Sequence, residues 1–470
     1  MPVMKRRSVL GLALAISALG PLASRSQGAE DQRPKQRVIV IGAGLAGLAA
    51  ARRLQEQGHR VLVLEGRDRL GGRTWTSNAW TDLPIDLGAG WIHGVQGNPI
   101  TDLARASGAR LVPTDLESIQ VYGVGGRPLT EAQQAQLDDL DRRLSRALKS
   151  LSPAQGPDRS LLERLQASLG WDRLNPQERQ QLAYLIDSRF EQEYGASARE
   201  LSSRWIDADS AFDGPDALLQ PGFGALVAHL ARGLTIQLGQ RVTAIDGSGR
   251  GGAPVTVSCQ ADGGAGSSTS HDADRVLVTV PLGVLKAGRI RFDPPLPAEK
   301  QAAIQQLGMG TLNKCCLRFA RPFWPTGVDW LGRITDTAEG WNEWVSLFRP
   351  LKQPVLIGFQ AGSAAETIET WSDQRQIASA MASLRQMYGA AIPDPIAVQI
   401  SRWHQDPMAL GAYSFQAVGS TPAMRQALAT PMGGRIFFAG EATSTDQFGT
   451  THGAFLSGLR AAAEMASSST

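Results

Sequence analysis

The chain has 470 residues, of which 42% are hydrophobic and 19% are charged, and its formal net charge is +3. This composition excludes general disorder, and a chain of this length normally folds into at least two domains. The charge excess lies at the N-terminus, where residues 1–29 carry four basic residues and no acidic one, so that about −1 remains for the rest. We therefore expect no nucleic-acid partner, because the body of the chain has no basic excess.

Residues 1–29 have the pattern of an export signal. Lys5, Arg6 and Arg7 precede the apolar stretch Ser8–Ala23, and small residues follow it. This stretch is too short for a helix that crosses about 30 Å of hydrocarbon at about 1.5 Å per residue, so we expect no permanent membrane span. The pair Arg6-Arg7 resembles that of a twin-arginine (Tat) signal. The sequence thus predicts export by the Tat machinery and a periplasmic location.

The body of the chain begins with a βαβ pattern. Val38–Ile41 and Val61–Leu64 are predicted to be buried strands. An Ala/Leu-rich helix is expected between them, beginning after Gly44 and ending at Gly58.

The turn of this unit carries a dinucleotide-binding fingerprint. Gly42 permits the tight turn, Gly44 lets a pyrophosphate approach the backbone, and Gly47 lets the helix pack on the strand. Glu65 ends the second strand, where a carboxylate accepts hydrogen bonds from ribose hydroxyls. The alternative is a glycine turn that only packs tightly. No second fingerprint follows in the sequence, which disfavours a nicotinamide–flavin reductase. The turn residues expected at the cofactor are Gly42, Ala43, Gly44, Leu45, Ala46 and Gly47.

The middle of the chain has two parts. Residues 100–215 are mostly helical by pattern. A small antiparallel meander is predicted over Thr235–Ile245, Val255–Cys259 and Arg275–Val280, with a Gly/Ser-rich tip at Gly263–Ser270.

The C-terminal part mixes strands and helices. Strands are predicted at Leu312–Phe319 and Val355–Gln360, and a helix over Ser372–Tyr388. A closing strand, Arg435–Ala439, precedes a small-residue helix over His452–Met465. The three cysteines are too few for a disulfide framework and are expected to be inert packing residues.

Three blocks of sequence carry a resemblance to a known family. They are Glu65–Arg73, Asp86–Gly94 and residues 435–458, in that order. Together they resemble the FAD-dependent amine oxidases and, within these, the polyamine oxidases. The resemblance implies an α/β fold with a Rossmann-like FAD-binding domain and a substrate domain of mixed sheet and helices. The implied division is 36–99, 216–292 and 402–466 for the FAD-binding domain, and 100–215 and 293–401 for the substrate-binding domain.

The resemblance also implies contacts to an extended FAD. Glu65 would hold the adenosine ribose and Arg73 the phosphates, while Gly88–Trp91 would pass beside the isoalloxazine. Val242 would meet the adenine through its backbone, and Gly440-Glu441 the ribityl chain and pyrophosphate. Further contacts are expected from Gly66, Arg67, Gly72, Gly88, Ala89, Gly90, Trp91, Trp403, Gly440, Glu441, Thr450 and Thr451.

Two features bear on how the flavin is held. Monoamine oxidases bond the flavin to a cysteine where this chain has Ala412, so FAD is expected to be noncovalent. A helix that begins near Thr451 would direct its N-terminal dipole at the flavin, where it favours the negative charge of the reduced ring. The alternative for this helix is packing alone.

Five residues are expected at the reacting end. Lys314, in an apolar strand of a chain with only seven lysines, would hold a water against the flavin; a solvated strand lysine is the alternative. Trp403 would pack near the flavin, and Tyr413 would be one wall of an aromatic slot whose second wall is Thr450 here. Core packing is the alternative for both aromatics. His93 would lie at the substrate channel, or serve only structure.

The expected reaction is oxidation of a polyamine, spermine or spermidine, at a carbon next to nitrogen. Hydride would pass to flavin N5, the imine would hydrolyse to an aldehyde and an amine, and O₂ would be reduced to H₂O₂. An oxidase of a basic L-amino acid or another primary amine is the alternative, disfavoured because Trp91 and Ile92 stand where amino-acid oxidases carry an arginine. A noncatalytic flavin-binding electron carrier is the alternative of another class. The candidate acids for the channel are Glu191, Glu193, Asp207 and Asp209. No metal site is expected.

Overall fold

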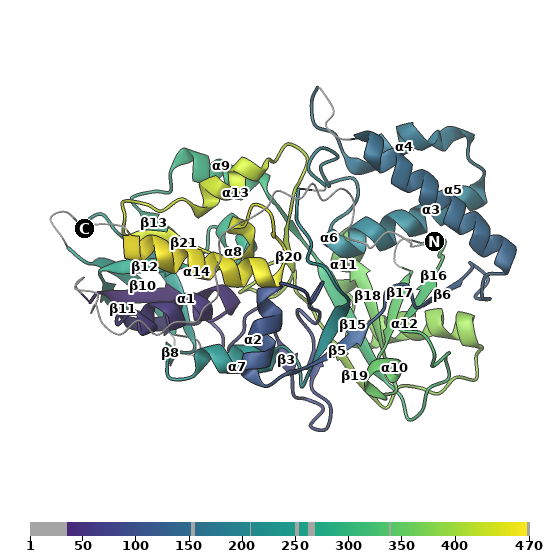
Figure 1. Ribbon diagram of the computed structural model, residues 1–470, viewed down its shortest axis with the longest axis horizontal. Helices are drawn as coiled ribbons and strands as arrows, with labels where there is room; N and C mark the ends of the chain where they lie inside the picture. Colours follow the sequence, from purple (N-terminus) through teal and green to yellow (C-terminus); the bar gives the residue numbers. More distant parts are fainter. Residues whose placement is uncertain are drawn as a thin grey trace.

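The computed structural model describes residues 35–151, 156–206, 208–249, 253–261, 268–337 and 340–467. The predicted export signal, the candidate acid Asp207 and most of the Gly/Ser-rich tip lie outside these described residues. The chain forms two lobes, one around a parallel sheet and one around a mixed sheet (Figure 1). Among the helices of the described ranges, none is both long and apolar enough to cross a membrane.

Five parallel strands form the first sheet, in the order β21-β12-β1-β2-β8. The central strands are almost fully buried, as expected for Val/Ile/Leu runs in a parallel sheet. Helix α1 connects β1 to β2, so the predicted Rossmann-like unit is confirmed. The elements are β1 (Arg37–Ile41), α1 (Leu45–Glu56), β2 (Arg60–Leu64), β8 (Thr235–Gln237), β12 (Arg275–Val278) and β21 (Ile436–Phe438).

The predicted meander is partly wrong. β9 (Gln240–Asp246), β10 (Val255–Ala261) and β11 (Ser268–Ala273) do pair antiparallel, but β8 and β12 belong to the parallel sheet. β12 is buried at every residue, which suits the middle of a covered parallel sheet better than a half-exposed meander. The fourth strand of the small sheet is β13 (Arg291–Asp293), parallel to β9.

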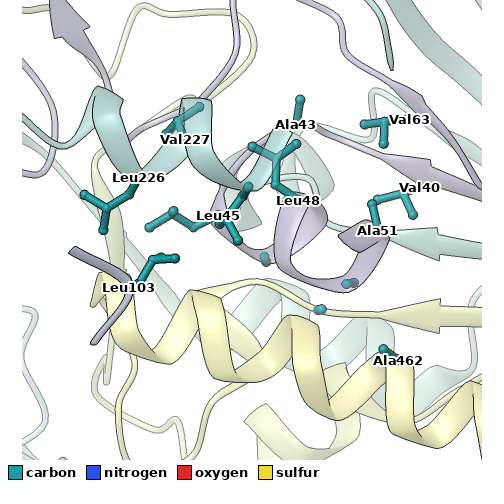
Figure 2. Close-up of a cluster of buried hydrophobic side chains, with 14 of the residues drawn as sticks. Val40, Ala43, Leu45, Leu48, Ala51, Val63, Leu103, Leu226, Val227 and Ala462 are labelled. Atoms are coloured by element: carbon teal, nitrogen blue, oxygen red, sulfur yellow. The ribbon is translucent and has the colours of Figure 1, made fainter. Parts of the chain in front are cut away.

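Helices α1 and α14 (Thr451–Ser467) cross closely in the core of the first lobe (Figure 2). Gly458 permits this approach, because a Cβ there would lie 2.2 Å from the carbonyl oxygen of Ala46. Helices α2 (Pro99–Ser107) and α7 (Gly224–Ala231) complete this core through Leu103, Leu226 and their neighbours. α2 therefore packs with the nucleotide-binding lobe, although the sequence placed the start of the substrate domain at residue 100.

The second sheet has six strands in the order β19-β15-β18-β17-β16-β6. β6 is parallel to β16 and the remaining pairs are antiparallel, so the sheet is mixed, as predicted. The strands are β6 (Ile119–Tyr122), β15 (Leu312–Arg318), β16 (Trp330–Arg333), β17 (Glu343–Ser346), β18 (Val355–Ala361) and β19 (Ala397–Ile400).

Helices α3, α4 and α5 lie at the upper right of Figure 1. They belong to residues 100–215, which the sequence predicted to be mostly helical. A π-helical turn follows α5 and places successive side chains toward the second sheet. The elements here are α3 (Glu131–Leu151), α4 (Leu161–Leu169), η1 (Trp171–Arg173), α5 (Pro176–Ile186), the π turn Asp187–Glu191 and α6 (Gln192–Tyr194).

The remaining elements lie around the two sheets. The strands are β3 (Thr76–Ser77), β4 (Ile85–Asp86), β5 (Arg110–Thr114), β7 (Asp216–Gln220), β14 (Gly308–Gly310) and β20 (Tyr413–Phe415). The helices are α8 (Leu282–Lys286), α9 (Ala298–Gln306), α10 (Phe348–Leu351), α11 (Gly362–Glu369), α12 (Asp373–Tyr388), α13 (Pro422–Ala429) and η3 (Glu441–Thr443).

Candidate active site

A continuous cavity of about 1810 Å³ joins the two lobes. It runs from the glycine turn after β1, past Lys314 on β15, to Glu343 on β17. Cavities for one small ligand usually measure about 300–1,000 Å³. The larger volume suits an extended dinucleotide together with a substrate.

The glycine turn has the geometry that its sequence predicts. Gly42 has φ +105°, and a Cβ there would lie 2.6 Å from Thr279 Oγ1. At Gly47 a Cβ would lie 2.0 Å from the Gly42 carbonyl oxygen, so α1 begins directly against the strand. This turn aims the first N–H groups of α1 at the cavity, as pyrophosphate binding requires.

Nearly all residues predicted at the cofactor line the cavity. Two do not: the N–H of Ala43 donates to Glu65 Oε2 (2.7 Å), and Gly47 packs beneath the turn, so both shape the turn from outside the cavity. Those that line it are Gly42, Gly44, Leu45, Ala46, Glu65, Gly66, Arg67, Gly72, Arg73, Gly88, Ala89, Gly90, Trp91, Val242, Trp403, Gly440, Glu441, Thr450 and Thr451.

Charged pairs hold the cofactor end of the cavity. Glu65 is buried at the end of β2, where its Oε1 also accepts the Arg67 N–H (2.9 Å). Arg73 Nη1 donates to Glu441 Oε1 (2.8 Å). Burial alone would raise the pKa of Glu441, but the charge of Arg73 and the hydrogen bond from Ser414 hold it below its ordinary value. The glycine turn, a carboxylate for ribose and a cation for phosphate are the groups that FAD requires.

Lys314 lies where the two lobes meet. Its Nζ donates to the carbonyl oxygens of Asp86 (2.8 Å) and Gly88 (2.7 Å), and lies 5.4 Å from the ring centroid of Trp91. Burial lowers the pKa of Lys314. Burial also raises the pKa of the Asp86 carboxyl to about 6. The alternative of a solvated strand lysine does not match this buried position.

The aromatic candidates are fixed by hydrogen bonds. Trp403 is buried, and its Nε1 donates to the Leu87 carbonyl (3.1 Å). The hydroxyl of Tyr413 donates to the Gln192 carbonyl (3.2 Å). Both rings line the cavity, so neither is only a core residue.

Thr450 and Thr451 connect the slot to α14. Helix α14 begins at Thr451, as the sequence predicted. Thr450 Oγ1 accepts the N–H of Gly453 (2.9 Å), which caps the helix start. The positive end of α14 therefore lies at the cavity.

His93 lines the cavity next to an acid. Its Nδ1 lies 2.9 Å from Asp216 Oδ2, and Asp216 Oδ1 accepts the N–H of Gly94 (2.8 Å). An ionised carboxylate accepts hydrogen bonds only, so it favours the imidazole form that carries hydrogen on Nδ1. The other ring nitrogen is then left to act as an acceptor or, in the cation, as a donor.

The candidate acids of the channel do not all lie in the cavity. Glu193 lines the cavity, whereas Glu191 accepts the Ala198 N–H (2.7 Å) and Asp209 lies 3.4 Å from the Tyr194 hydroxyl, both outside the cavity lining. Burial raises the pKa of Glu191. Asp207 lies outside the described residues.

Sequence reasoning missed the wall of the cavity formed by the second sheet. Trp91, Trp330 and Phe359 pack together with ring centroids 6.1 Å apart in each pair, and Glu343 lies beside them in the lining. The only signal was a glutamate within a strand-like run, at Glu343-Trp344-Val345. Within the described ranges, no three His, Cys, Asp or Glu residues are grouped so that they could hold a metal ion.

Comparison with known proteins gives the family of this chain. The family model of flavin-containing amine oxidoreductases matches residues 45–466. A probable polyamine oxidase 4 of Arabidopsis thaliana is 35% identical over 440 residues, 90% of this chain and 86% of the relative. Polyamine oxidase 4 of Oryza sativa subsp. japonica is 36% identical over 91% of this chain and 88% of its own length.

Two further matches support less: one covers only half of the relative, and the other has low sequence identity. Lysine-specific histone demethylase 1 homolog 1 of Arabidopsis thaliana is 36% identical over 91% of this chain, but the match covers 52% of that protein. A solved double mutant of putrescine oxidase superposes with a TM-score of 0.73 over 92% of this chain and 99% of its own. At 20% identity this likeness shows the fold alone.

The predicted fold, cofactor and enzyme class are therefore confirmed, and the noncatalytic carrier is set aside. The chain is an enzyme that uses FAD to oxidise amines, and it belongs to the flavin-containing amine oxidoreductase family.

Proposed function

We propose that the amine is a polyamine, spermine or spermidine, oxidised at a carbon next to nitrogen, with O₂ as the electron acceptor. The observation that carries this proposal is one continuous cavity, which joins the cofactor turn to Lys314 and then to a wall that contains carboxylates. A long, flexible polycation fits such an elongated space.

The residues of the cavity would position the amine, exclude bulk water from it and provide charged groups around it. When bound, FAD accepts the electrons and hydrogen taken from the carbon beside the amine nitrogen and passes them to O₂. Trp403 and Tyr413 line the cavity, and a dry slot beside them would favour the neutral amine that the reaction requires, because desolvation disfavours the charged form. Lys314 is held by two backbone carbonyls and orients a water there. Imine hydrolysis then gives an aldehyde and a shorter amine.

Carboxylates of the cavity bind the nitrogens that stay protonated. Glu193, Asp216 and Glu343 all lie in the lining. An ammonium is attracted to carboxylates more strongly in a partly enclosed cavity than in bulk water, so these acids suit the protonated nitrogens of the substrate.

Anaerobic mixing with amines tests the proposal. Spermine, spermidine, putrescine, phenylethylamine, arginine and a methyl-lysine peptide are each added to the yellow enzyme, and flavin absorbance is followed. Bleaching by spermine or spermidine at the lowest concentrations is expected, and H₂O₂ should form when air is admitted. Bleaching by arginine alone, or by the peptide alone, would assign the enzyme to another substrate.

A basic L-amino acid is the disfavoured alternative. Ile92 is buried, and Trp91 packs on Trp330 and Phe359 with its Nε1 donating to Thr114 Oγ1 (3.2 Å). Neither side chain offers a cation to a substrate carboxylate. The arginine arm of the panel checks this reasoning.

We also propose that the enzyme is exported through the Tat route to the periplasm. The basis is the sequence pattern of residues 1–29, with the pair Arg6-Arg7. Replacing both arginines by lysine should leave the enzyme in the cytoplasm, measured by fractionation. Unchanged export of this variant would contradict the Tat route.

A further inference from the structure

Three consecutive carbonyl groups, those of Asp86, Leu87 and Gly88, are held by two side chains of the cavity. Lys314 Nζ donates to the first (2.8 Å) and the third (2.7 Å), and Trp403 Nε1 donates to the second (3.1 Å). The residues of this contact that line the cavity are Leu87, Gly88, Lys314 and Trp403. The position of this part of the wall therefore depends on where the two donors are held.

Both donors are attached to one asparagine behind the cavity. Asn313 precedes Lys314 on β15, so its side chain points to the opposite face of the sheet. Its Oδ1 accepts the backbone N–H of Trp403 (3.0 Å) and the hydroxyl of Ser401 (3.3 Å). Ser401 Oγ in turn accepts the backbone N–H of Lys314 (2.8 Å). A single amide oxygen thus connects the backbone of Trp403 with that of Lys314.

Glu369, the last residue of α11, fixes this asparagine. Its Oε1 accepts Asn313 Nδ2 (2.7 Å) and the N–H of His404 (2.9 Å), and its Oε2 accepts the N–H of Gln405 (3.0 Å). An ionised carboxylate can only accept, so the NH₂ group of Asn313 must face Glu369 and its oxygen must face Trp403. Hydrogen bonds to a charged acceptor are also stronger than those to a neutral one.

These residues lie outside the cavity and touch it only through others. Asn313, Ser401 and Glu369 are 7%, 2% and 3% exposed, and none of the three is in the cavity lining. Burial of a charge is costly unless hydrogen bonds compensate it. For Glu369 the donors named above all belong to Asn313 or to the segment that follows Trp403. The compensation is therefore concentrated on the support of the two cavity donors.

We propose that Asn313 and Glu369 form a positioning pair, which aligns Trp403 and Lys314 on the segment Asp86–Gly88 and so sets the geometry in which the amine is oxidised. The inference concerns amine oxidation itself and holds for whichever amine is the substrate. A misplacement of about 1 Å can slow a catalysed reaction about a hundredfold. A disturbed pair should therefore change the rate of the reaction although neither residue meets the amine.

The test exchanges the two partners. Asn313→Asp removes the NH₂ donor and places two carboxylates against each other. The limiting rate of flavin reduction, measured by anaerobic stopped-flow with the amine that bleaches the wild type best, should fall about tenfold or more. Adding Glu369→Gln to this variant returns an NH₂ donor between the two positions, so the double variant should be faster than Asn313→Asp alone. Two unrelated losses would instead multiply, because their free energies add.

Hydrogen exchange gives a measurement that does not depend on turnover. The backbone N–H groups of residues 403–405 donate to Asn313 or Glu369. Asn313→Asp should therefore speed deuterium uptake in peptides that cover residues 403–405, followed by mass spectrometry of the FAD-loaded enzyme. Peptides that cover residues 86–88 should respond in the same direction, and the added Glu369→Gln should slow the uptake again.

Two control variants separate positioning from general stability. Ser160→Ala removes the N-cap of α4, where Ser160 Oγ accepts the N–H of Glu163 (3.1 Å), so it should lower the unfolding midpoint. It should change neither the reduction rate nor the exchange of residues 403–405. Glu299→Gln, an acid-to-amide change at an exposed position of α9, should change none of these quantities. Rates are expressed per bound flavin for every variant.

The results that contradict the pair are specific. Reduction of Asn313→Asp at the wild-type rate, or a further loss of rate on adding Glu369→Gln, would overturn it. Should Asn313→Asp fail to fold, Ser401→Ala decides, because it removes the link from Asn313 to the Lys314 N–H; unchanged reduction and exchange would then overturn the inference. If another amine bleaches the wild type but no polyamine does, the proposed substrate is wrong and the pair is judged with that amine.

Discussion

At the scale of single residues, Lys314 has a tightly constrained position in the cavity. Two backbone carbonyls of the segment Asp86–Gly88 accept hydrogen bonds from its Nζ, so the ammonium is held although the side chain is long. The Asp86 carboxylate below accepts a hydrogen bond from the N–H of Phe223 (3.1 Å). This network connects β15 of the second lobe to the loop that follows β4 in the first.

Replacing Lys314 by Met should keep FAD bound and slow flavin reduction or reoxidation at least tenfold, or about 1.4 kcal/mol. Methionine fills a similar volume but has no donor for the water beside the flavin. Flavin content and both half-reactions are measured by absorbance and stopped-flow. Equal rates for Lys314→Met and the wild type would remove Lys314 from the reaction.

Glu343 is a cavity residue that the sequence did not predict. Lys314 could be predicted because a rare lysine in an apolar strand is conspicuous and because the family resemblance assigns it. Glu343 had no motif around it. Its position depends on the pairing of β15, β18 and β17, and strand register depends on contacts across the sheet that no local pattern encodes.

At the scale of elements, two helices carry their N-termini to the cofactor end of the cavity and cross where both have small residues. The N-termini of α1 and α14 are at Leu45 and Thr451, which both line the cavity. The crossing at Gly458 fixes their relative position. The sequence predicted both helices, whereas it misplaced β8 and β12, because a short apolar run fits either a parallel sheet or a meander.

Gly458→Ala should destabilise the enzyme and weaken FAD binding. The added methyl would lie 2.2 Å from the Ala46 carbonyl oxygen, so the helices must move apart. Overpacking of this kind costs about 1–3 kcal/mol. Denaturant titration and FAD titration of the apoenzyme measure the two effects. Gly327→Ala, where a Cβ meets nothing within 4 Å, is the matched control. Equal stability of the two variants would contradict the close crossing.

Lys300 on α9 predicts how stability depends on pH. Its Nζ donates to the carbonyls of Ala427 (2.8 Å) and Leu428 (2.6 Å), at the last turn of α13, and lies 4.0 Å from the Phe438 ring. Burial, aided by the charge of Arg460, lowers the pKa of Lys300 from 10.5 to about 7. As pH falls, Lys300 therefore becomes protonated at a higher pH in the unfolded chain than in the folded enzyme. The free energy of unfolding should then decrease as pH decreases from 10.5 to 7.

The comparison of wild type with Lys300→Met isolates this group from other titrating residues. As pH rises from 7 to 10, the wild type should gain stability relative to the variant, by several kcal/mol at most, at about 1.4 kcal/mol per pKa unit. Urea midpoints at each pH measure the difference. Lys149→Met, at an exposed position, should show no such trend. A difference independent of pH would mean that Lys300 stays charged in the folded enzyme.

At the scale of the whole molecule, the cofactor end of the cavity is assembled from distant parts of the chain. Gly42 and Arg73 come from the first quarter, Val242 from the middle, and Glu441 and Thr451 from the last helix region. The order of the motif blocks allowed this convergence to be predicted. The contact between the two lobes could not be predicted from motif order, because it depends on how β15 docks against the loop at Gly88.

Because the cofactor end is built from distant parts of the chain, bound FAD should stabilise the folded enzyme as well as serve as its cofactor. Ala412 offers no thiol to the flavin, so we expect FAD to be noncovalent and acid precipitation to release all of it into solution. A ligand present at 100 times its Kd stabilises the folded state by about 2.7 kcal/mol. Apoenzyme should therefore unfold at a lower temperature than holoenzyme, and added FAD should restore the unfolding midpoint in a concentration-dependent way. Riboflavin should restore little of it, because riboflavin lacks the phosphates that Arg73 and the glycine turn would bind. Flavin that stays with the precipitated protein would show a covalent bond, and equal rescue by riboflavin would contradict the role of the pyrophosphate end.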